Sequence, residues 1–145
     1  DFIFRDKYPK YLRLRKAGER TISDYKNDIN PGSWLPIIIK DPDKILLSTG
    51  YGLKIARDIS LTTPYKNFSI YSCPIWGQKY ADKQIKNLQK FKKIITVEDH
   101  LNAGGFGSWL SENTKNSNKI ESLYIKTSVI GMVGDEDYLL KTNLK

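Results

Sequence analysis

The sequence predicts an α/β domain in which a mostly parallel sheet of five strands lies between helices. Short apolar runs rich in Ile, Leu and Val alternate along the chain with segments whose apolar residues recur at helical spacing. The joins between these segments are short. A strand–helix alternation with short joins places successive strands parallel in one sheet, because each helix carries the chain back across the sheet face.

The predicted domain begins at residue 33. The first strand covers residues 35–39, and an Asp-Pro-Asp turn at residues 41–43 leads into a second strand over residues 44–49. A Gly-Tyr-Gly turn closes this strand. Ile55, Ala56 and Ile59 then recur at the spacing of a helix.

The alternation continues through the second half of the chain. We expect strands over residues 68–73, 94–97 and 120–125, and helices over residues 79–93, 106–114 and 135–140. Pro74 ends the first of these strands because proline has no amide hydrogen for a sheet ladder. The Ile-Ile-Thr-Val strand is β-branched throughout, as expected of a strand that is covered on both faces.

The first 32 residues differ from the rest. Residues 11–15 alternate apolar and basic side chains, which suggests a strand, but too few residues precede them to build a sheet. Residues 16–32 are polar and contain glycine, asparagine and proline breakers. We therefore expect residues 1–15 to be the tail of a preceding domain, residues 16–32 to be a linker, and residues 33–145 to form one domain.

The placement of the charges and the hydropathy argue against two classes of partner, nucleic acid and membrane. The net charge of +8 raises the question of nucleic acid. In the helix expected over residues 79–93, one face carries an apolar stripe formed by Ala81, Ile85, Leu88 and Phe91. The lysines mostly lie on the remaining face, as on an ordinary solvated helix. Nothing resembles a recognition helix, so we expect no nucleic acid. No apolar run approaches the roughly 18 residues of a membrane span, so we expect no membrane either.

The chain contains one cysteine and one histidine. A single cysteine excludes an internal disulfide, which fits a cytoplasmic protein. One cysteine and one histidine cannot form a classical zinc site, so no metal site is predicted. Cys73 lies at a strand end, and we interpret it as a small buried residue rather than a nucleophile.

An acidic cluster with the histidine follows the fourth strand. Glu98, Asp99 and His100 carry groups suited to acid–base chemistry, since a carboxylate can orient an imidazole. Neighbouring side chains of an extended segment point in different directions, however, so adjacency in sequence is not contact. A helix-capping or interface role is therefore favoured over catalysis.

Three glycines follow this cluster. Gly104, Gly105 and Gly107 open the next helix but lack the Lys and Ser/Thr of a phosphate loop. An anion could bind at such a helix start, but close packing of the helix on the strand is the favoured interpretation. These residue types predict no catalytic residue, and they indicate an accessory domain.

The acidic cluster and glycines carry a family resemblance. Residues 96–108, Thr-Val-Glu-Asp-His-Leu-Asn-Ala-Gly-Gly-Phe-Gly-Ser, closely resemble the "TVEEH…GGLGS" signature of the transketolase C-terminal domain. Residues 45–50 are similar to its "TLIATG" start, and residues 134–144 to its closing pattern. Residues 11–14 resemble the end of the pyrimidine-binding domain that precedes the linker in this family.

The resemblance implies a three-layer sandwich with a five-stranded, mostly parallel mixed sheet and helices on both faces. The parent would be a transferase of carbohydrate metabolism that moves two-carbon ketol units between sugars with thiamine diphosphate and Mg²⁺. Those cofactors would bind to the N-terminal part of the same enzyme or to a partner subunit, in a homodimer. This domain would hold no cofactor, and would serve subunit packing without being catalytic.

The resemblance also assigns residues. It places Arg13 where the family contacts the sugar phosphate, with Arg15 and His100 as further candidates for the same channel; a guanidinium suits phosphate. Glu98, Asp99, His100 and the three glycines would face a neighbouring domain. The alternatives are the C-terminal domain of a deoxyxylulose-phosphate synthase or of a 2-oxoacid dehydrogenase β-subunit, or a non-enzymatic interaction module.

Overall fold

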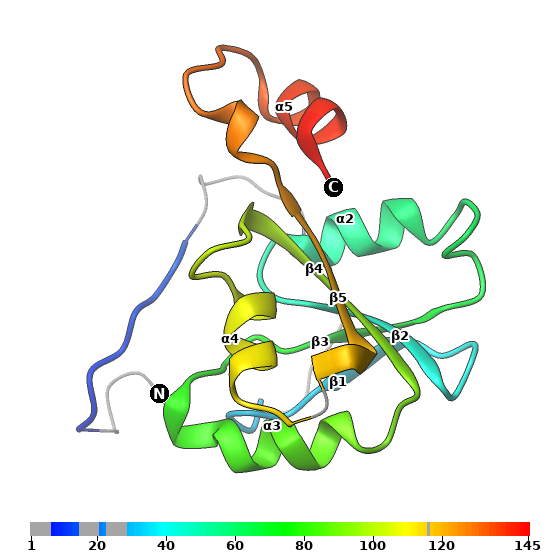
Figure 1. The fold of residues 1–145 in the computed structure, drawn as a ribbon, viewed down its shortest axis with the longest axis vertical. Coiled ribbons are helices and arrows are strands. Elements are labelled where there is room, and N and C mark those ends of the chain that lie inside the picture. The colour runs from blue at the N-terminus through cyan, green and yellow to red at the C-terminus, as the bar shows by residue number, and fades with distance from the viewer. Residues whose placement is uncertain (1–6, 15–20, 23–28, 116) are drawn as a thin grey trace.

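The computed structural model describes residues 7–14, 21–22, 29–115 and 117–145 (Figure 1). The strands are β1 (Leu35–Ile38), β2 (Lys44–Ser48), β3 (Ser69–Ser72), β4 (Lys93–Leu101) and β5 (Ile120–Ile125). The α-helices in these ranges are α2 (Gly52–Ile59), α3 (Ala81–Leu88), α4 (Phe106–Glu112) and α5 (Glu136–Asn143). Three 3₁₀ turns join them: η1 (Gln78–Tyr80), η2 (Ser117–Lys119) and η3 (Thr127–Val129).

The five strands form one mixed sheet in the order β1-β3-β2-β4-β5. Strands β3, β2, β4 and β5 are parallel, and β1 pairs antiparallel with β3. The short turn between β1 and β2 reverses the chain direction, whereas a parallel pair needs a crossover of a dozen or more residues. The predicted α/β class with a mostly parallel sheet is confirmed.

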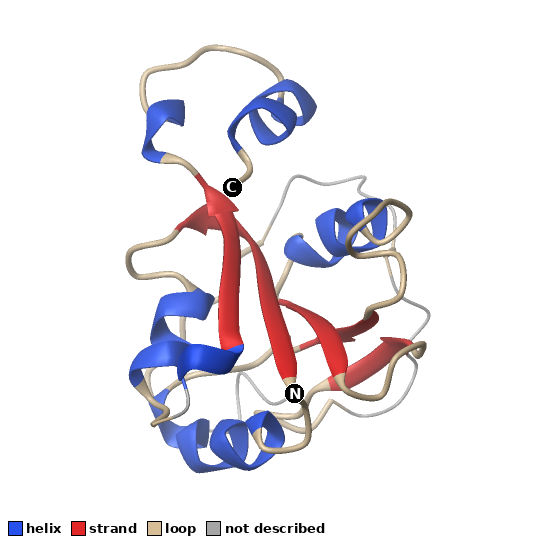
Figure 2. Ribbon diagram, turned by 45° about the vertical axis from the view of Figure 1, so that its right-hand side comes forward, coloured by secondary structure: helices blue, strands red, loops and turns tan. Residues whose placement is uncertain are grey.

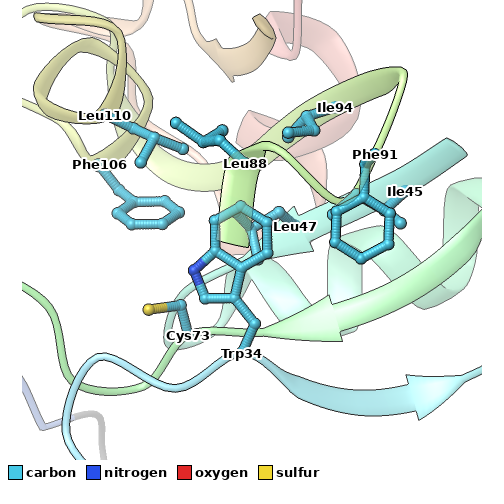
Figure 3. Packing of buried hydrophobic residues seen from close by; sticks show 9 residues of the cluster. All are labelled: Trp34, Ile45, Leu47, Cys73, Leu88, Phe91, Ile94, Phe106 and Leu110. Atoms are coloured by element: carbon cyan, nitrogen blue, oxygen red, sulfur yellow. The ribbon is translucent and has the colours of Figure 1, made fainter. Parts of the chain in front are cut away.

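Helices cover both faces of the sheet, as Figure 2 shows. On one face, Ile45, Leu47 and Ile94 pack against Leu88 of α3 and Leu110 of α4. Figure 3 shows this cluster, which Trp34, Cys73, Phe91 and Phe106 complete. The alternate strand residues Leu46, Ile95 and Val97 point to the other face and pack against α2. Side chains of successive strand residues face opposite sides, so the continuous apolar runs of β2 and β4 build two cores.

Strand β4 is longer than predicted. It continues from Val97 through Glu98, Asp99 and His100 to Leu101. Beyond an irregular register, Leu101 still pairs with Ile125 of β5. The acidic cluster is therefore part of a strand. A prediction based on apolar runs ends the strand at Val97, because the residues that follow are polar.

Two other expectations need correction. Residues 11–14 form no strand in the structure and are exposed, since no neighbouring strand lies beside them in the part of the chain described. On α3, Gln84 is fully buried and Ile85 is only half-buried, so the predicted apolar stripe is interrupted by an amide. The remaining strand and helix ends differ from the predictions by a few residues.

Of the predicted tail and linker, the structure describes residues 7–14, 21–22 and 29–32. The last linker residue, Gly32, is packed into the domain. Its amide donates to the Ile75 carbonyl at 2.8 Å, and its carbonyl accepts from Gln84 Nε2 at 2.9 Å. None of the helices in the described ranges has the length and apolarity needed to cross a bilayer.

Candidate functional site

The Glu98 carboxylate joins the end of β4 to the start of α4. Glu98 is 2% exposed. Its Oε2 accepts a hydrogen bond from the Phe106 amide at 2.7 Å, and its Oε1 accepts one from the Gly107 amide at 3.0 Å. Amides in the first turn of a helix lack intrahelical acceptors, and the helix N-terminus favours negative charge. Glu98 thus caps α4 from the neighbouring strand, the role that the sequence favours over catalysis.

The surroundings of Glu98 act on its proton affinity in opposite directions. Burial raises the pKa of Glu98, while the hydrogen bonds from the Gly107 and Phe106 amides lower it; burial has the larger effect. Both carboxylate oxygens are occupied by α4. Glu98 therefore presents no free carboxylate to an outside molecule.

The glycines around Glu98 allow close packing on both faces of β4. A Cβ on Gly107 would lie 2.3 Å from Ser122 Oγ and 2.4 Å from Thr96 Oγ1. A Cβ on Gly105 would lie 2.3 Å from Glu98 Oε2. On the opposite face, a Cβ on Gly52 would lie 2.2 Å from the Val97 carbonyl oxygen. A side chain at any of these positions would force its neighbours to shift, which supports the packing interpretation of Gly105 and Gly107.

Gly104 has a different role. Its φ of +73° lies in the left-handed region that glycine adopts freely, and a Cβ there would meet nothing within 4 Å. Gly104 therefore serves the turn between β4 and α4, whereas the next two glycines of the motif serve the contact between them.

The structure brings Arg13 to Asp99. The guanidinium Nη1 donates to Oδ1 at 3.0 Å and Nη2 donates to Oδ2 at 2.8 Å, the paired geometry in which a guanidinium fork matches a carboxylate. The side chain of Asp99 is 10% exposed and that of Arg13 is 51% exposed. The arginine that the resemblance assigns to a sugar phosphate is thus engaged with a carboxylate of this chain. Arg15 lies outside the described residues.

His100 does not form a catalytic pair with its acidic neighbours. It is exposed, and its Nδ1 lies 2.8 Å from the Leu101 carbonyl oxygen. Within the described ranges, His100 shares no hydrogen bond with either Glu98 or Asp99. The three residues of the cluster therefore serve separate contacts.

Aromatic side chains fill the carboxyl end of the sheet, where α/β proteins usually bind ligands. The ring of Trp76, which follows β3, lies 5.2 Å from Phe106 and 5.1 Å from Trp109 between centroids. The indole Nε1 of Trp76 donates to Thr49 Oγ1, just beyond β2, at 3.2 Å. Sequence reasoning missed this cluster because its aromatic members follow two different strands, β3 and β4.

Sequence reasoning also missed a buried set of hydrogen bonds around the Gln84 side chain. Gln84 Oε1 accepts from the indole of Trp34, and the amide group of Gln84 bonds Gly32. Cys73 Sγ lies 3.8 Å from the same oxygen. Burial raises the pKa of the Cys73 thiol to about 12. This keeps the thiol protonated and supports the interpretation of Cys73 as a structural residue.

The described residues do not fit thiamine diphosphate with its metal ion. The α4 amides that could bind a diphosphate already bind Glu98. At the start of α2, the amides of Gly52, Leu53 and Lys54 already donate to carbonyls of the preceding turn. No group of three or more His, Cys, Asp or Glu side chains with metal-binding geometry occurs among the residues described.

Comparison with known proteins finds similarity in structure only. No protein-family model matches the sequence, and no characterised protein matches it by sequence. A solved structure described as "Split gene transketolase, inactive beta4 tetramer" is similar, with a TM-score of 0.60 and 13% sequence identity. The match covers 86% of this chain and 40% of that chain. At this identity the likeness shows a transketolase-like fold, in agreement with the sequence resemblance.

Proposed function

We propose that this chain is the C-terminal domain of a transketolase-like enzyme that transfers two-carbon ketol units between sugars. The observation that carries the proposal is the transketolase-like fold over 86% of the chain. The "TVEDH…GGFGS" motif supports it, because in this fold the motif forms one structural unit: its glutamate caps the helix that its glycines bring onto the strand.

In this proposal the domain stabilises the assembly and contributes no catalytic residue. The first amides of α2 and of α4, the two glycine-flanked helix starts, are already hydrogen-bonded within the domain. Thiamine diphosphate and Mg²⁺ would bind to another part of the enzyme, either in the same polypeptide or in a partner subunit, and the assembled enzyme would be a homodimer. We place that enzyme in the cytoplasm, since the one cysteine is buried and reduced.

The proposal is tested on the protein in its own cell. A tag is added to the chromosomal gene, the assembly is purified, and thiamine diphosphate is measured as fluorescent thiochrome after acid release. We expect cofactor equimolar with the tagged chain, together with ketol transfer from a ketose phosphate to an aldose phosphate. Residues 1–145 expressed alone are the matched control.

The other outcomes separate the alternatives. If the assembly contains the cofactor but has a pyruvate-dependent activity, the parent enzyme is a deoxyxylulose-phosphate synthase or a 2-oxoacid dehydrogenase and not a transketolase. An assembly without thiamine diphosphate would overturn the enzymatic proposal and favour an interaction module.

A further inference from the structure

Three apolar side chains beyond the carboxyl end of β5 are exposed to solvent. Ile130 is 71% exposed, Met132 38% and Val133 95%. Residues 130–133, here called the apolar tip, lie between η3 and α5, in the part of the chain that stands away from the sheet (Figure 1). Clustered exposed apolar side chains mark interaction surfaces, whereas scattered single ones are ordinary.

The apolar tip is held in place by α5. Asn143 of this helix is 3% exposed, its Oδ1 accepts from Ser128 Oγ at 2.9 Å, and its Nδ2 lies 3.6 Å from Met132 Sδ. The amides of Ile130 and Met132 donate to carbonyls of the preceding turn, each at 3.0 Å. A surface that is ordered before binding loses little conformational entropy on binding. The tip therefore has the fixed form that a docking element needs.

The charge around the apolar tip is opposite to that of the rest of the chain. Residues 127–140 contain three acidic residues and no basic residue, in a chain whose net charge is +8. Complementary charge favours and orients a contact between two surfaces. The surface that fits the tip is therefore an apolar recess with basic residues around it.

A hollow of this character lies at the other end of β5. The ends of α3 and α4 enclose a hollow of about 580 Å³. It is lined by Ile85, Gln89, Glu112, Asn113, Thr114 and Lys115. The half-buried Ile85 provides an apolar wall. Lys115 and the exposed Lys86, next to Ile85 in the sequence, bring two positive charges against the one negative charge of Glu112.

The apolar tip cannot reach the hollow of its own chain. The chain enters β5 after the end of α4 and η2, and it leaves β5 directly before η3 and the tip. The six residues of β5 separate the two surfaces by about 20 Å. Figure 1 shows α3 and α5 at opposite ends of the molecule. A contact between tip and hollow therefore requires a second copy.

We propose that the apolar tip of one copy docks into the hollow between α3 and α4 of a second copy. Ile130 and Val133 then pack against Ile85, and the acidic start of α5 lies near Lys86 and Lys115. Tip and hollow are different surfaces, so the contact joins copies head to tail and closes when two copies dock reciprocally. This contact is independent of the ketol transfer proposed above.

A disulfide cross-link tests which surfaces meet. Val133→Cys and Gln89→Cys are made as two separate proteins, in which the native thiol of Cys73 is buried. When they are mixed and mildly oxidised, we expect the main product to be a linked pair that contains one of each. A disulfide forms only where the two Cβ atoms come within about 4.5 Å.

Leu61→Cys is the matched control for Gln89→Cys. Leu61 is 75% exposed and follows α2, which covers the other face of the sheet. This variant should link to Val133→Cys about tenfold less than Gln89→Cys does. Linkage of Val133→Cys mainly to itself, or equally to both partners, would overturn the docking.

Sedimentation equilibrium of residues 1–145 at low salt measures the strength of the contact. Val133→Asp places a charge in the apolar contact and should weaken self-association about tenfold or more; Val133 is 95% exposed, so the fold is unaffected. Lys86→Glu should weaken it about three- to tenfold. Lys66→Glu makes the same change of charge on an exposed lysine after α2 and should leave it at the parental value. A parent chain that stays monomeric to about 1 mM, or equal association constants in all variants, would overturn the proposal.

Discussion

At the scale of single residues, Glu98 is expected to stabilise the fold through the hydrogen bonds of its carboxylate. Glu98→Ala removes the acceptor of two helix-start amides, Phe106 and Gly107, and leaves a cavity between β4 and α4. Because this substitution removes a helix cap and leaves two buried amides without an acceptor, we expect the free energy of unfolding to fall by about 2–3 kcal/mol. Urea denaturation measures it. Glu112→Ala, at the exposed end of α4, is the control and should change stability by less than about 0.5 kcal/mol.

The same residue makes stability depend on pH. Burial raises the pKa of Glu98 above its usual value of 4.5, so the folded chain binds this proton more tightly than the unfolded chain. The resulting stabilisation is complete below pH 4.5 and is lost as the pH rises through the folded-state pKa. Glu98→Gln has no such proton. Denaturation at several pH values from 4.5 upward should show the parent losing stability relative to this variant; a constant difference would contradict the assignment.

At the scale of elements, the contact of α4 with β4 and β5 depends on Gly107. Gly107→Ala would place a Cβ 2.3 Å from Ser122 Oγ and 2.4 Å from Thr96 Oγ1, so the helix must move away from the sheet. We expect a loss of about 2–3 kcal/mol by urea denaturation, as for other overpacked cores. Gly104→Ala is the matched control, because it is strained by its φ of +73° but meets no atom within 4 Å. It should cost about 1 kcal/mol. Equal losses would mean that the turn, and not the packing, requires these glycines.

Elements that depend on local sequence were predictable, and contacts between distant residues were not. The Ile94–Val97 run and the glycine-opened helix follow from β-branched content and apolar spacing. The extension of β4 through His100 does not, because pairing with β5 fixes it. The capping role of Glu98 was predictable from its place before a helix. The Arg13–Asp99 pair joins residues 86 positions apart, and Gln84 is buried because Trp34 and Gly32 bond it.

At the scale of the whole molecule, we propose that the cofactor of the proposed parent enzyme binds outside this chain. In a calorimetric titration of residues 1–145 with thiamine diphosphate and Mg²⁺, we expect no saturable heat beyond that of Mg²⁺ alone. The reason is structural: Glu98 already accepts from the first amides of α4, and the first amides of α2 donate to carbonyls of the preceding turn. The assembly purified from the cell is the positive control and should retain the cofactor. Micromolar binding to the chain alone would mean that this domain takes part in cofactor binding, and the assignment of the cofactor to another part of the enzyme would be wrong.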